Sequence, residues 1–237
     1  PLGLRLHYCG YETVKPEICP SCGSPHIGGF KAGTQQIEKV IEKEFPKARV
    51  LRMDFDTTRT KDSYEKILAS FAKHEADILV GTQMIVKGHD FPNVTLVGVI
   101  AADLSLNMDD YHCGERTFQL LTQAVGRSGR GNRPGQAVIQ TYQPEHYSIQ
   151  AAAIQDYEKF YKEEMGYRML LDYPPAAHMM TVFGACQDEE LLKNAMYYIE
   201  VFIRRVSPKE ELHMIGPAAA SVGKVKDVYR QVIHLKH

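Results

Sequence analysis

Short apolar runs alternate with amphipathic segments from residue 27 to residue 142, and this alternation constrains the fold more than any other feature of the chain. The runs expected to form strands are 49–53, 77–80, 94–101 and 136–141. The segments between them carry apolar residues at helical spacing, as in Ile37, Val40, Ile41 and Phe45. Strands that alternate with helices through short connections form parallel sheets covered by helices. The pattern therefore predicts an α/β domain with a doubly wound parallel sheet.

Three local expectations refine this outline. Thr34 is expected to be the N-cap of the first helix, because a threonine hydroxyl can accept a hydrogen bond from an unpaired helical N–H group. The strand at 94–101 is nearly all apolar and β-branched, which predicts burial on both faces. One long helix is expected to lead out of the domain, with an apolar side made of Ile149, Ala153, Tyr157, Phe160 and Met165.

Polar segments interrupt this pattern at 52–58, 81–92, 101–103 and 119–131. Ligands of doubly wound sheets bind at the carboxyl ends of the strands, so we expect these segments to meet at one sheet edge. Each segment also has a structural interpretation, because Thr82 could cap a helix, Gly88 could mark a turn and Asp103 could simply end a strand. Their combination at one edge favours a binding site.

The segment 119–131 reads QLLTQAVGRSGRG, and its first half has the apolar spacing of a helix. Arg127 and Arg130 are three residues apart, so a continuing helix would present them from one face. Glycines at 126, 129 and 131 let a backbone or a ligand come close. Paired guanidinium groups suit a phosphate, because each donates parallel hydrogen bonds and is always charged. The alternative interpretation is a solvated basic turn.

The cysteines near the N-terminus have part of a zinc-binding pattern. Cys19 and Cys22 have the spacing of a zinc knuckle, and Cys9 precedes a glycine as Cys22 does. Three thiolates do not close a tetrahedral site, although His7 or His26 could be the fourth ligand. A loop with free thiols is the favoured alternative.

The remaining composition excludes some classes of protein. Five cysteines, an odd number in a chain of 237 residues, argue against a disulfide scaffold and for a reducing cytoplasm. The net charge is −1, so any surface that attracts nucleic acid must be local. No apolar run approaches the length of a membrane span, which predicts no contact with membranes.

The last third of the chain predicts a second module, of α+β class, over 173–237. A strand at 178–186 precedes a helix with a strong apolar stripe, and strands at 212–215 and 228–235 follow it. The basic residues near the end of the chain are opposed only by Asp227 and have Tyr229 among them; they are Lys224, Lys226, Arg230 and Lys236. Such a group suits a nucleic-acid backbone and an unpaired base, although a solvated hairpin is the alternative.

The pattern Gln-x-x-Gly-Arg-x-Gly-Arg, from Gln123 to Arg130, resembles the last conserved motif of superfamily 2 helicases. The arginines of that motif reach an ATP bound mainly by another lobe. Together with GTQM at 81–84, KGHDFPNVTLV at 87–97 and CPSCGS at 19–24, it resembles the bacterial replication-restart DNA helicases, the primosomal protein N′ family. This resemblance covers essentially the whole chain.

The resemblance implies a domain organisation. Residues 29–172 would be a RecA-like helicase lobe 2 with its exit helix. Residues 1–28 would be the remnant of a zinc ribbon, with Cys9, Cys19 and Cys22 as metal ligands and with Leu6 where the family has a cysteine. Residues 173–237 would be a truncated α+β C-terminal domain that contacts DNA.

The resemblance also implies roles for individual residues. Arg127 and Arg130 would be catalytic, acting on the phosphoryl group that ATP transfers. The residues implied at the nucleotide are Gln123, Gly126, Gly88 and Asp90. The residues implied at DNA are Thr82, Gln83 and Lys87 in the lobe and Lys224, Lys226, Tyr229 and Arg230 near the end of the chain.

The function implied is that of the C-terminal part of an ATP-dependent DNA helicase, which remodels stalled replication forks for primosome assembly and replication restart. The full-length protein would use ATP, Mg and Zn, with forked DNA, primosome proteins and single-strand-binding proteins as partners. The 237 residues contain no Gly-x-x-x-x-Gly-Lys-[Ser/Thr] phosphate loop, so this chain alone is expected to be inactive. For the same reason Asp103 and the segment 109–112, which mimic a Walker B aspartate and a DEAH box, are expected to serve no nucleotide. The alternative function is a non-catalytic DNA- or partner-binding module.

Overall fold

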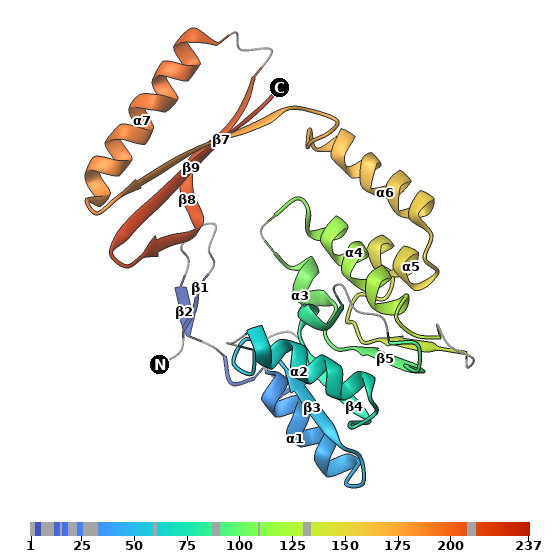
Figure 1. The fold of residues 1–237 in the computed structure, drawn as a ribbon. Helices are drawn as coiled ribbons and strands as arrows, with labels where there is room; N and C mark the ends of the chain where they lie inside the picture. The colour runs from blue at the N-terminus through green and yellow to red at the C-terminus, as the bar shows by residue number, and fades with distance from the viewer. Residues whose placement is uncertain are drawn as a thin grey trace. The chain divides into compact units, whose positions relative to one another are not determined.

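The computed structural model describes residues 3–5, 12–14, 16–18, 23–25, 33–58, 61–86, 91–108, 110–129, 134–207 and 212–237. The chain forms two compact units (Figure 1). One unit is Gly28–Phe160, and the other joins Pro1–Ile27 to Tyr161–His237. In the described part of the chain, no helix is both long enough and apolar enough to cross a lipid bilayer.

Strands and helices alternate through the first unit, as the apolar pattern predicts. In chain order its elements are α1 (Thr34–Glu44), β3 (Val50–Met53), α2 (Lys61–Ala72), β4 (Ile78–Gly81), the 3-10 helix η1 (Gln83–Val86), β5 (Leu96–Val99), α3 (Asp103–Leu106), α4 (Cys113–Val125), β6 (Gln136–Ile139) and α5 (Tyr147–Ala153). The helix α6 (Tyr157–Leu170) follows and continues into the other unit.

The strands of this unit pair in parallel, which confirms the predicted α/β class. β3 pairs with β4, and Val50 lies opposite Ile78. β5 pairs with β6, and Leu96 lies opposite Gln136. The described residues form these two separate two-stranded sheets rather than the single sheet that was predicted.

The β5–β6 pair is covered on one face only. Val99 and Ile139 pack against the main core, whereas the side chains of Leu96 and Val138 are 61% and 59% exposed. The prediction that this strand is buried on both faces is therefore wrong for the described residues. An apolar run shows that a strand can be buried, but the number of covered faces depends on which elements pack against it.

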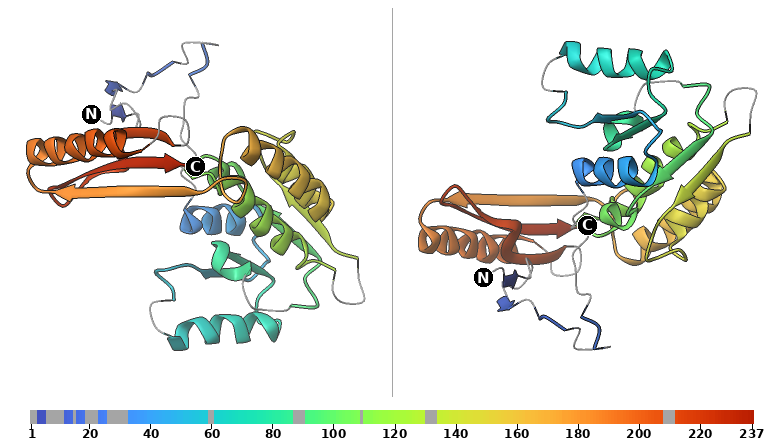
Figure 2. Two further views of the ribbon diagram at one scale, coloured as in Figure 1. Left: turned by 90° about the horizontal axis from the view of Figure 1, so that it is seen from above. Right: turned by 90° about the horizontal axis from the view of Figure 1, so that it is seen from below.

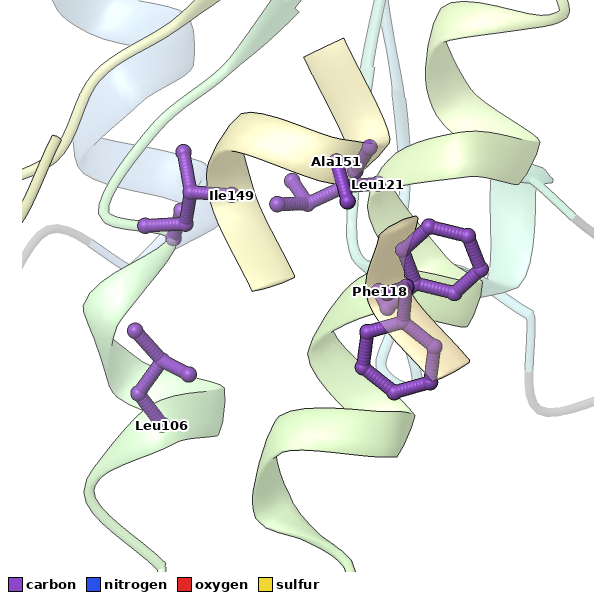
Figure 3. Packing of buried hydrophobic residues seen from close by; sticks show 8 residues of the cluster. Leu106, Phe118, Leu121, Ile149 and Ala151 are labelled. Carbon is purple, nitrogen blue, oxygen red and sulfur yellow. The ribbon is translucent and has the colours of Figure 1, made fainter. Parts of the chain in front are cut away.

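The core of this unit lies between α3, α4, α5 and the start of α6 (Figure 3). Phe118 of α4 stacks on Phe160 of α6 with their ring centroids 4.2 Å apart. The buried residues of this cluster are Ala102, Leu106, Phe118, Leu121, Ile149, Ala151, Ala152 and Phe160. Because α4 contributes its inner face to this core, the direction of α4 and the place where it ends are fixed by packing.

The predicted long exit helix is two helices. α5 ends at Ala153 and α6 begins at Tyr157, with Gln155 between them in the left-handed region at φ 55°. Asp156 accepts a hydrogen bond from the backbone N–H of Lys159 at 2.9 Å, as an N-cap does. The apolar spacing continues across the break, which is why periodicity alone missed it.

The first helix also begins differently from the prediction. Gly33 is the residue at the N-cap position of α1, and Thr34 is the first helical residue. The hydroxyl of Thr34 donates to Asp54 instead, at 2.5 Å. The predicted Thr34 cap is therefore wrong, because Thr34 is already inside the helix, which begins one residue earlier than a Thr34 cap requires.

The second unit contains the predicted β-α-β-β module. Its elements are β7 (Met179–Cys186), α7 (Glu189–Val206), β8 (His213–Val225) and β9 (Val228–Lys236). The strands form an antiparallel sheet in the order β7-β9-β8, and α7 lies along one face of it (Figures 1 and 2). The short strands β1 (Gly3–Arg5) and β2 (Glu12–Val14) pair antiparallel with each other.

Packing between α7 and β9 holds this module together. Leu192 and Met196 of α7 are buried against Ile233 and Leu235 of β9. Asp188 begins the helix by accepting a hydrogen bond from the backbone N–H of Leu191 at 3.0 Å. The cap and the buried face together explain why this helix forms where the sequence predicts it.

Candidate functional site: an arginine turn at the end of α4

The arginine motif lies at the end of the helix α4, so the contacts that fix α4 also fix the position of the motif. Thr117 is fully buried, and its hydroxyl lies 2.8 Å from the carbonyl oxygen of Cys113 and 2.8 Å from the hydroxyl of Ser105. At the start of the helix, Asp110 accepts hydrogen bonds from the backbone N–H and the ring of His112 and pairs with Arg116 at 2.7 Å. These contacts anchor α4 at its beginning and along its inner face.

The helix ends immediately before the first arginine. Val125 is the last helical residue, and the backbone N–H of Gly126 donates to the carbonyl oxygen of Thr122 at 2.9 Å. Arg127 and Ser128 follow in a tight turn, in which their N–H groups reach the carbonyl oxygens of Ala124 and Val125. The helix therefore covers the first half of the segment, as its apolar spacing predicts, and does not continue through Arg127. We call residues 126–129 the arginine turn.

Two glycines close the arginine turn against the chain that enters β6. Gly129 has φ +76°, a conformation that glycine adopts at little cost. A Cβ atom built on Gly129 would lie 2.5 Å from the backbone nitrogen of Gly135. The N–H of Gly129 also donates to the carbonyl oxygen of Val94 at 3.1 Å. This part of the motif therefore brings two backbones into contact, as its glycines predict.

These contacts place the arginine turn at the amino edge of the β5–β6 pair. Val94 precedes β5 and Gly135 precedes β6. The prediction that the arginines share the carboxyl edge with the other polar segments is wrong. In a parallel β-α-β unit the helix runs back along the sheet, so a loop after a helix lies at the opposite edge from a loop after a strand.

Three of the residues predicted at the nucleotide lie together at this end of α4. Gln123 is exposed on the last turn of the helix, Gly126 ends it and Arg127 is half-buried in the turn. A Cβ atom on Gly126 would meet the carbonyl oxygen of Thr122 at 3.1 Å. Arg130 and Gly131 lie outside the described residues.

The predicted DNA track begins at the carboxyl end of β4. Thr82 and Gln83 are exposed there, and the hydroxyl of Thr82 lies 3.5 Å from the backbone nitrogen of Met84. Gly81 lets β4 approach β3, because a Cβ atom on it would lie 2.5 Å from the carbonyl oxygen of Met53. The remaining predicted residues of this loop, Lys87, Gly88 and Asp90, lie outside the described residues.

A buried carboxylate at the end of β3 was not singled out from the sequence. Asp54 accepts hydrogen bonds from the hydroxyl of Thr34 and the backbone N–H of Thr57, and it pairs with Arg52 at 3.3 Å. The hydroxyl of Thr34 is the main cause that lowers the pKa of Asp54 below its ordinary value. Asp54 therefore stays ionised and fixes the start of α1 to the end of β3.

Asp103, four residues after the end of β5, is a second buried carboxylate that holds two segments together. It is buried and accepts hydrogen bonds from the hydroxyl of Thr141 at 2.7 Å and from the backbone N–H of Tyr142 at 3.0 Å. Burial alone would raise the pKa of Asp103, but these hydrogen bonds outweigh it and leave the pKa below its ordinary value. Its carboxylate oxygens hold the loop after β6. The aspartate that resembles a Walker B residue therefore has a structural role here.

The predicted basic residues of the second unit gather on one hairpin. Lys226 and Asp227 form its two-residue turn, both with positive φ, between β8 and β9. Lys224 pairs with Asp227 at 3.2 Å, and its Nζ lies 3.2 Å from the hydroxyl and 4.4 Å from the ring centroid of Tyr229. The hydrogen bond to Tyr229, followed by the one to Asp227, raises the pKa of Lys224.

Two details of this hairpin differ from the expectation. Tyr229 is half-buried against the core of its unit, so less of its ring is open to a base than its place among lysines suggests. Lys236 is buried; its Nζ donates to the carbonyl oxygen of Leu171 at 2.8 Å and lies 3.6 Å from the ring centroid of Tyr173. Lys236 therefore adds no charge to the surface, whereas Lys224, Lys226 and Arg230 remain on the hairpin.

The predicted zinc ligands Cys9, Cys19 and Cys22 lie outside the described residues. Among the described residues, no group of three or more metal-binding side chains occurs. The metal site therefore stays a prediction.

The fold and the arginine turn define a class of protein. Residues 29–132, which include the β3–β4 pair, β5, α4 and the arginine turn, match the family described as the helicase conserved C-terminal domain. The chain therefore contains the C-terminal domain of a helicase.

The similarity to particular proteins is closer. The chain is 46% identical over 235 residues to the replication restart protein PriA of Bacillus subtilis (strain 168), which aligns 99% of this chain with 29% of the relative. The corresponding protein of Synechocystis sp. is 42% identical, with 99% of this chain and 28% of the relative aligned. That of Haemophilus influenzae is 34% identical, with 99% and 32% aligned. The chain belongs to the PriA family of replication restart proteins, and it spans less than a third of the length of these relatives.

Proposed function

We propose that this chain is part of a longer ATP-dependent DNA helicase that acts at stalled replication forks. The observation that carries the proposal is the arginine turn, which a packed helix and a glycine–glycine contact hold at one edge of a parallel strand pair. A rigid turn with arginine is suited to meet a phosphate group supplied from elsewhere, because little ordering remains to be done when it binds. The names of the relatives support replication restart as the setting.

In this proposal the arginines act on charge that develops during phosphoryl transfer. Arg127 and Arg130 stabilise the transferring phosphoryl group, which spreads negative charge over its equatorial oxygens. Gln123 and Gly126, at the same end of α4, lie against the nucleotide. Because the 237 residues contain no phosphate loop, the nucleotide and its Mg²⁺ are held mainly by another part of the full-length helicase.

DNA is proposed to bind away from the arginine turn. Thr82, Gln83 and Lys87 follow β4 and line the track, while Gly88 and Asp90 in the same loop link the nucleotide to the grip on DNA. The hairpin residues Lys224, Lys226, Tyr229 and Arg230 add a second contact in the other unit. Loop groups at strand ends and basic groups on a hairpin are both suited to phosphates of a nucleic-acid backbone.

The cellular setting is proposed from the same family relationship. Forked DNA, primosome proteins and single-strand-binding proteins are the partners, in the cytoplasm. Cys9, Cys19 and Cys22 are proposed to contribute to a zinc site in the full-length helicase, where zinc would hold together a loop-rich segment.

The proposal is tested by ATP turnover on forked DNA. We expect the full-length helicase to hydrolyse ATP in a DNA-dependent way and the 237-residue chain to show no turnover above background, because the arginines alone have no positioned phosphates to meet. Turnover by the purified chain, at a rate that does not fall when contaminants are removed, would contradict the division of the ATP site. A full-length protein that binds forked DNA without turnover would favour a non-catalytic binding module.

The hairpin contact predicts weak, salt-sensitive DNA binding by the chain. Replacing Lys224, Lys226 and Arg230 together by alanine should lower both the affinity and the slope of log affinity against log salt. Each lost phosphate contact removes about 0.9 from that slope for duplex and about 0.7 for single strands. Lys224 is already paired with Asp227, so we expect the loss to come mainly from Lys226 and Arg230.

The measurement is a salt titration of fluorescence anisotropy with labelled DNA. A matched control removes three exposed lysines from the first unit, Lys39, Lys43 and Lys47, and so changes the net charge equally. Superimposable titrations for the hairpin variant and the control would show that the hairpin is ordinary solvated surface.

A further inference from the structure

The carboxyl edge of the β5–β6 pair has a small open hollow that the proposed roles do not use. Its lining residues are Ala101, Asp103, Gln140, Thr141 and Tyr142. All of them lie within four residues after the end of β5 or β6. The arginine turn lies at the amino edge of the same two strands, so the hollow and the turn are at opposite ends of the pair.

One side of the hollow is an exposed aromatic ring. Tyr142 is 87% exposed, which makes it the most exposed large apolar side chain in the part of the protein that the structure describes. An isolated tyrosine on a surface needs no explanation, because many apolar atoms remain exposed in any folded protein. The surroundings of Tyr142 distinguish it from such a residue.

The backbone beneath this ring is held rigidly. The N–H of Tyr142 donates to both carboxylate oxygens of Asp103, at 3.2 and 3.0 Å. The hydroxyl of Thr141 donates to Asp103 at 2.7 Å and accepts from the N–H of Gln143 at 2.9 Å. The buried carboxylate of Asp103 thus fixes the backbone from Thr141 to Gln143, directly or through Thr141, while the ring of Tyr142 stays exposed to solvent.

The lining segment that follows β5 is fixed as well. Ala101 has φ 55°, in the left-handed region that non-glycine residues rarely adopt. The N–H of Ala102 donates to the carbonyl oxygen of Gln140 at 3.1 Å, which ties the two strand ends together. Strained backbone persists where the surrounding structure imposes it, and such positions concentrate at binding sites.

The charge of the hollow selects among possible ligands. Asp103 is the carboxylate among its lining residues, and a carboxylate is an anion, so a phosphate is disfavoured there. A flat, uncharged group with hydrogen-bonding edges fits better, because it can lie on the ring while the amide of Gln140 offers both a donor and an acceptor. An unpaired nucleobase has these properties.

We propose that Tyr142 is a stacking platform for an unpaired nucleobase at the carboxyl edge of the β5–β6 pair, held in place by Asp103, which binds the backbone N–H of Tyr142 and the hydroxyl of Thr141. This inference rests on the proposed action of the protein on DNA and assigns a base-binding position to it. The rigid loop favours binding because the platform needs no ordering when the base arrives. Stacking depends on the flat face that every base shares, so the position would tolerate any sequence.

The test compares two single-stranded oligonucleotides of equal length and charge, one with thymine bases and one with abasic sugars. Base–aromatic stacking contributes about 1–3 kcal/mol per base, which corresponds to an affinity change of roughly 5-fold to 150-fold. We expect Tyr142→Ala to weaken binding of the thymine oligonucleotide within this range and to leave the abasic one unchanged. Tyr142→Phe keeps the ring and should bind like the wild type.

The control is Tyr198→Ala, which removes a 72% exposed tyrosine from α7 and should change neither affinity. Equal binding of the thymine oligonucleotide by wild type and Tyr142→Ala would overturn the stacking platform while leaving the proposed function intact. An equal loss for both oligonucleotides would also overturn it, because a change without a base cannot come from stacking. Failure of the wild type to bind either oligonucleotide would overturn the platform together with the proposed contact with DNA.

Discussion

Replacing Arg130 by alanine in the full-length helicase is expected to lower DNA-stimulated ATP turnover by about a thousandfold or more. An arginine that reaches the transferring phosphoryl group contributes an effect of this size, because it neutralises charge that develops only during the reaction. Arg127→Ala should act in the same direction, since Arg127 lies in the arginine turn itself. The measurement is steady-state hydrolysis of ATP at saturating DNA.

Folding and DNA binding should survive the substitution of Arg130. The residues that fix α4 belong to its inner face and to its first turn, and none of them changes. Arg205→Ala is the matched control, because it removes an exposed arginine from α7 and leaves every contact of α4 in place. If Arg130→Ala turned over ATP as fast as this control, its assignment to catalysis would be wrong.

Gly129→Ala is expected to have the second largest effect on ATP turnover. It removes no charge, and it acts by changing the shape of the arginine turn. The new methyl group would have to adopt φ +76° and would approach the backbone nitrogen of Gly135 to 2.5 Å. The left-handed conformation costs about 1–2 kcal/mol and the crowding about 1–3 kcal/mol more. The turn would therefore shift, and a shift of about 1 Å can lower a rate by about a hundredfold.

The control for this substitution is Gly98→Ala in β5. A Cβ atom on Gly98 meets nothing within 4 Å, and the residue lies in the same strand pair. Both variants would be compared by urea unfolding of the chain and by ATP turnover of the full-length helicase. Equal stability and equal turnover for the two variants would show that the contact between Gly129 and Gly135 does not shape the site.

Local patterns in the sequence predicted the order of the elements well. The alternation of apolar runs with helical spacing depends on neighbouring residues only, so β3, α2, β4 and β6 form at the predicted segments. The β-α-β-β order of the second module follows for the same reason. The arginine motif was recognisable because its glycines and arginines are close together in the chain.

Features that depend on distant residues were missed. The side chain of Thr34 binds Asp54 rather than its own helix, and Lys236 is buried beside Tyr173, and neither contact is visible in the spacing of residues. The buried carboxylate of Asp103 that holds the loop after β6 likewise joins residues far apart in the sequence. Contacts of this kind can be predicted only after the arrangement of the strands and helices is known.

The edge at which the arginine turn lies could have been derived from topology alone. Parallel strands require each helix to run back, so the loop between α4 and β6 belongs at the amino edge. The break between α5 and α6 also had a signal, because Asp156 is a good N-cap residue before Lys159. The rule that ligands bind at the carboxyl edge does not apply to a loop that follows a helix, and apolar spacing alone does not show a break such as the one at Gln155.

The two arginines are proposed to recognise the transition state of phosphoryl transfer. This proposal is tested most directly by the affinity of the full-length helicase for ADP with aluminium fluoride, which mimics that state, beside its affinity for ADP alone. The wild type should bind the mimic about a hundredfold or more tightly than ADP, and the Arg127→Ala/Arg130→Ala double variant should bind the two equally. A double variant that keeps the wild-type preference for the mimic would contradict the account.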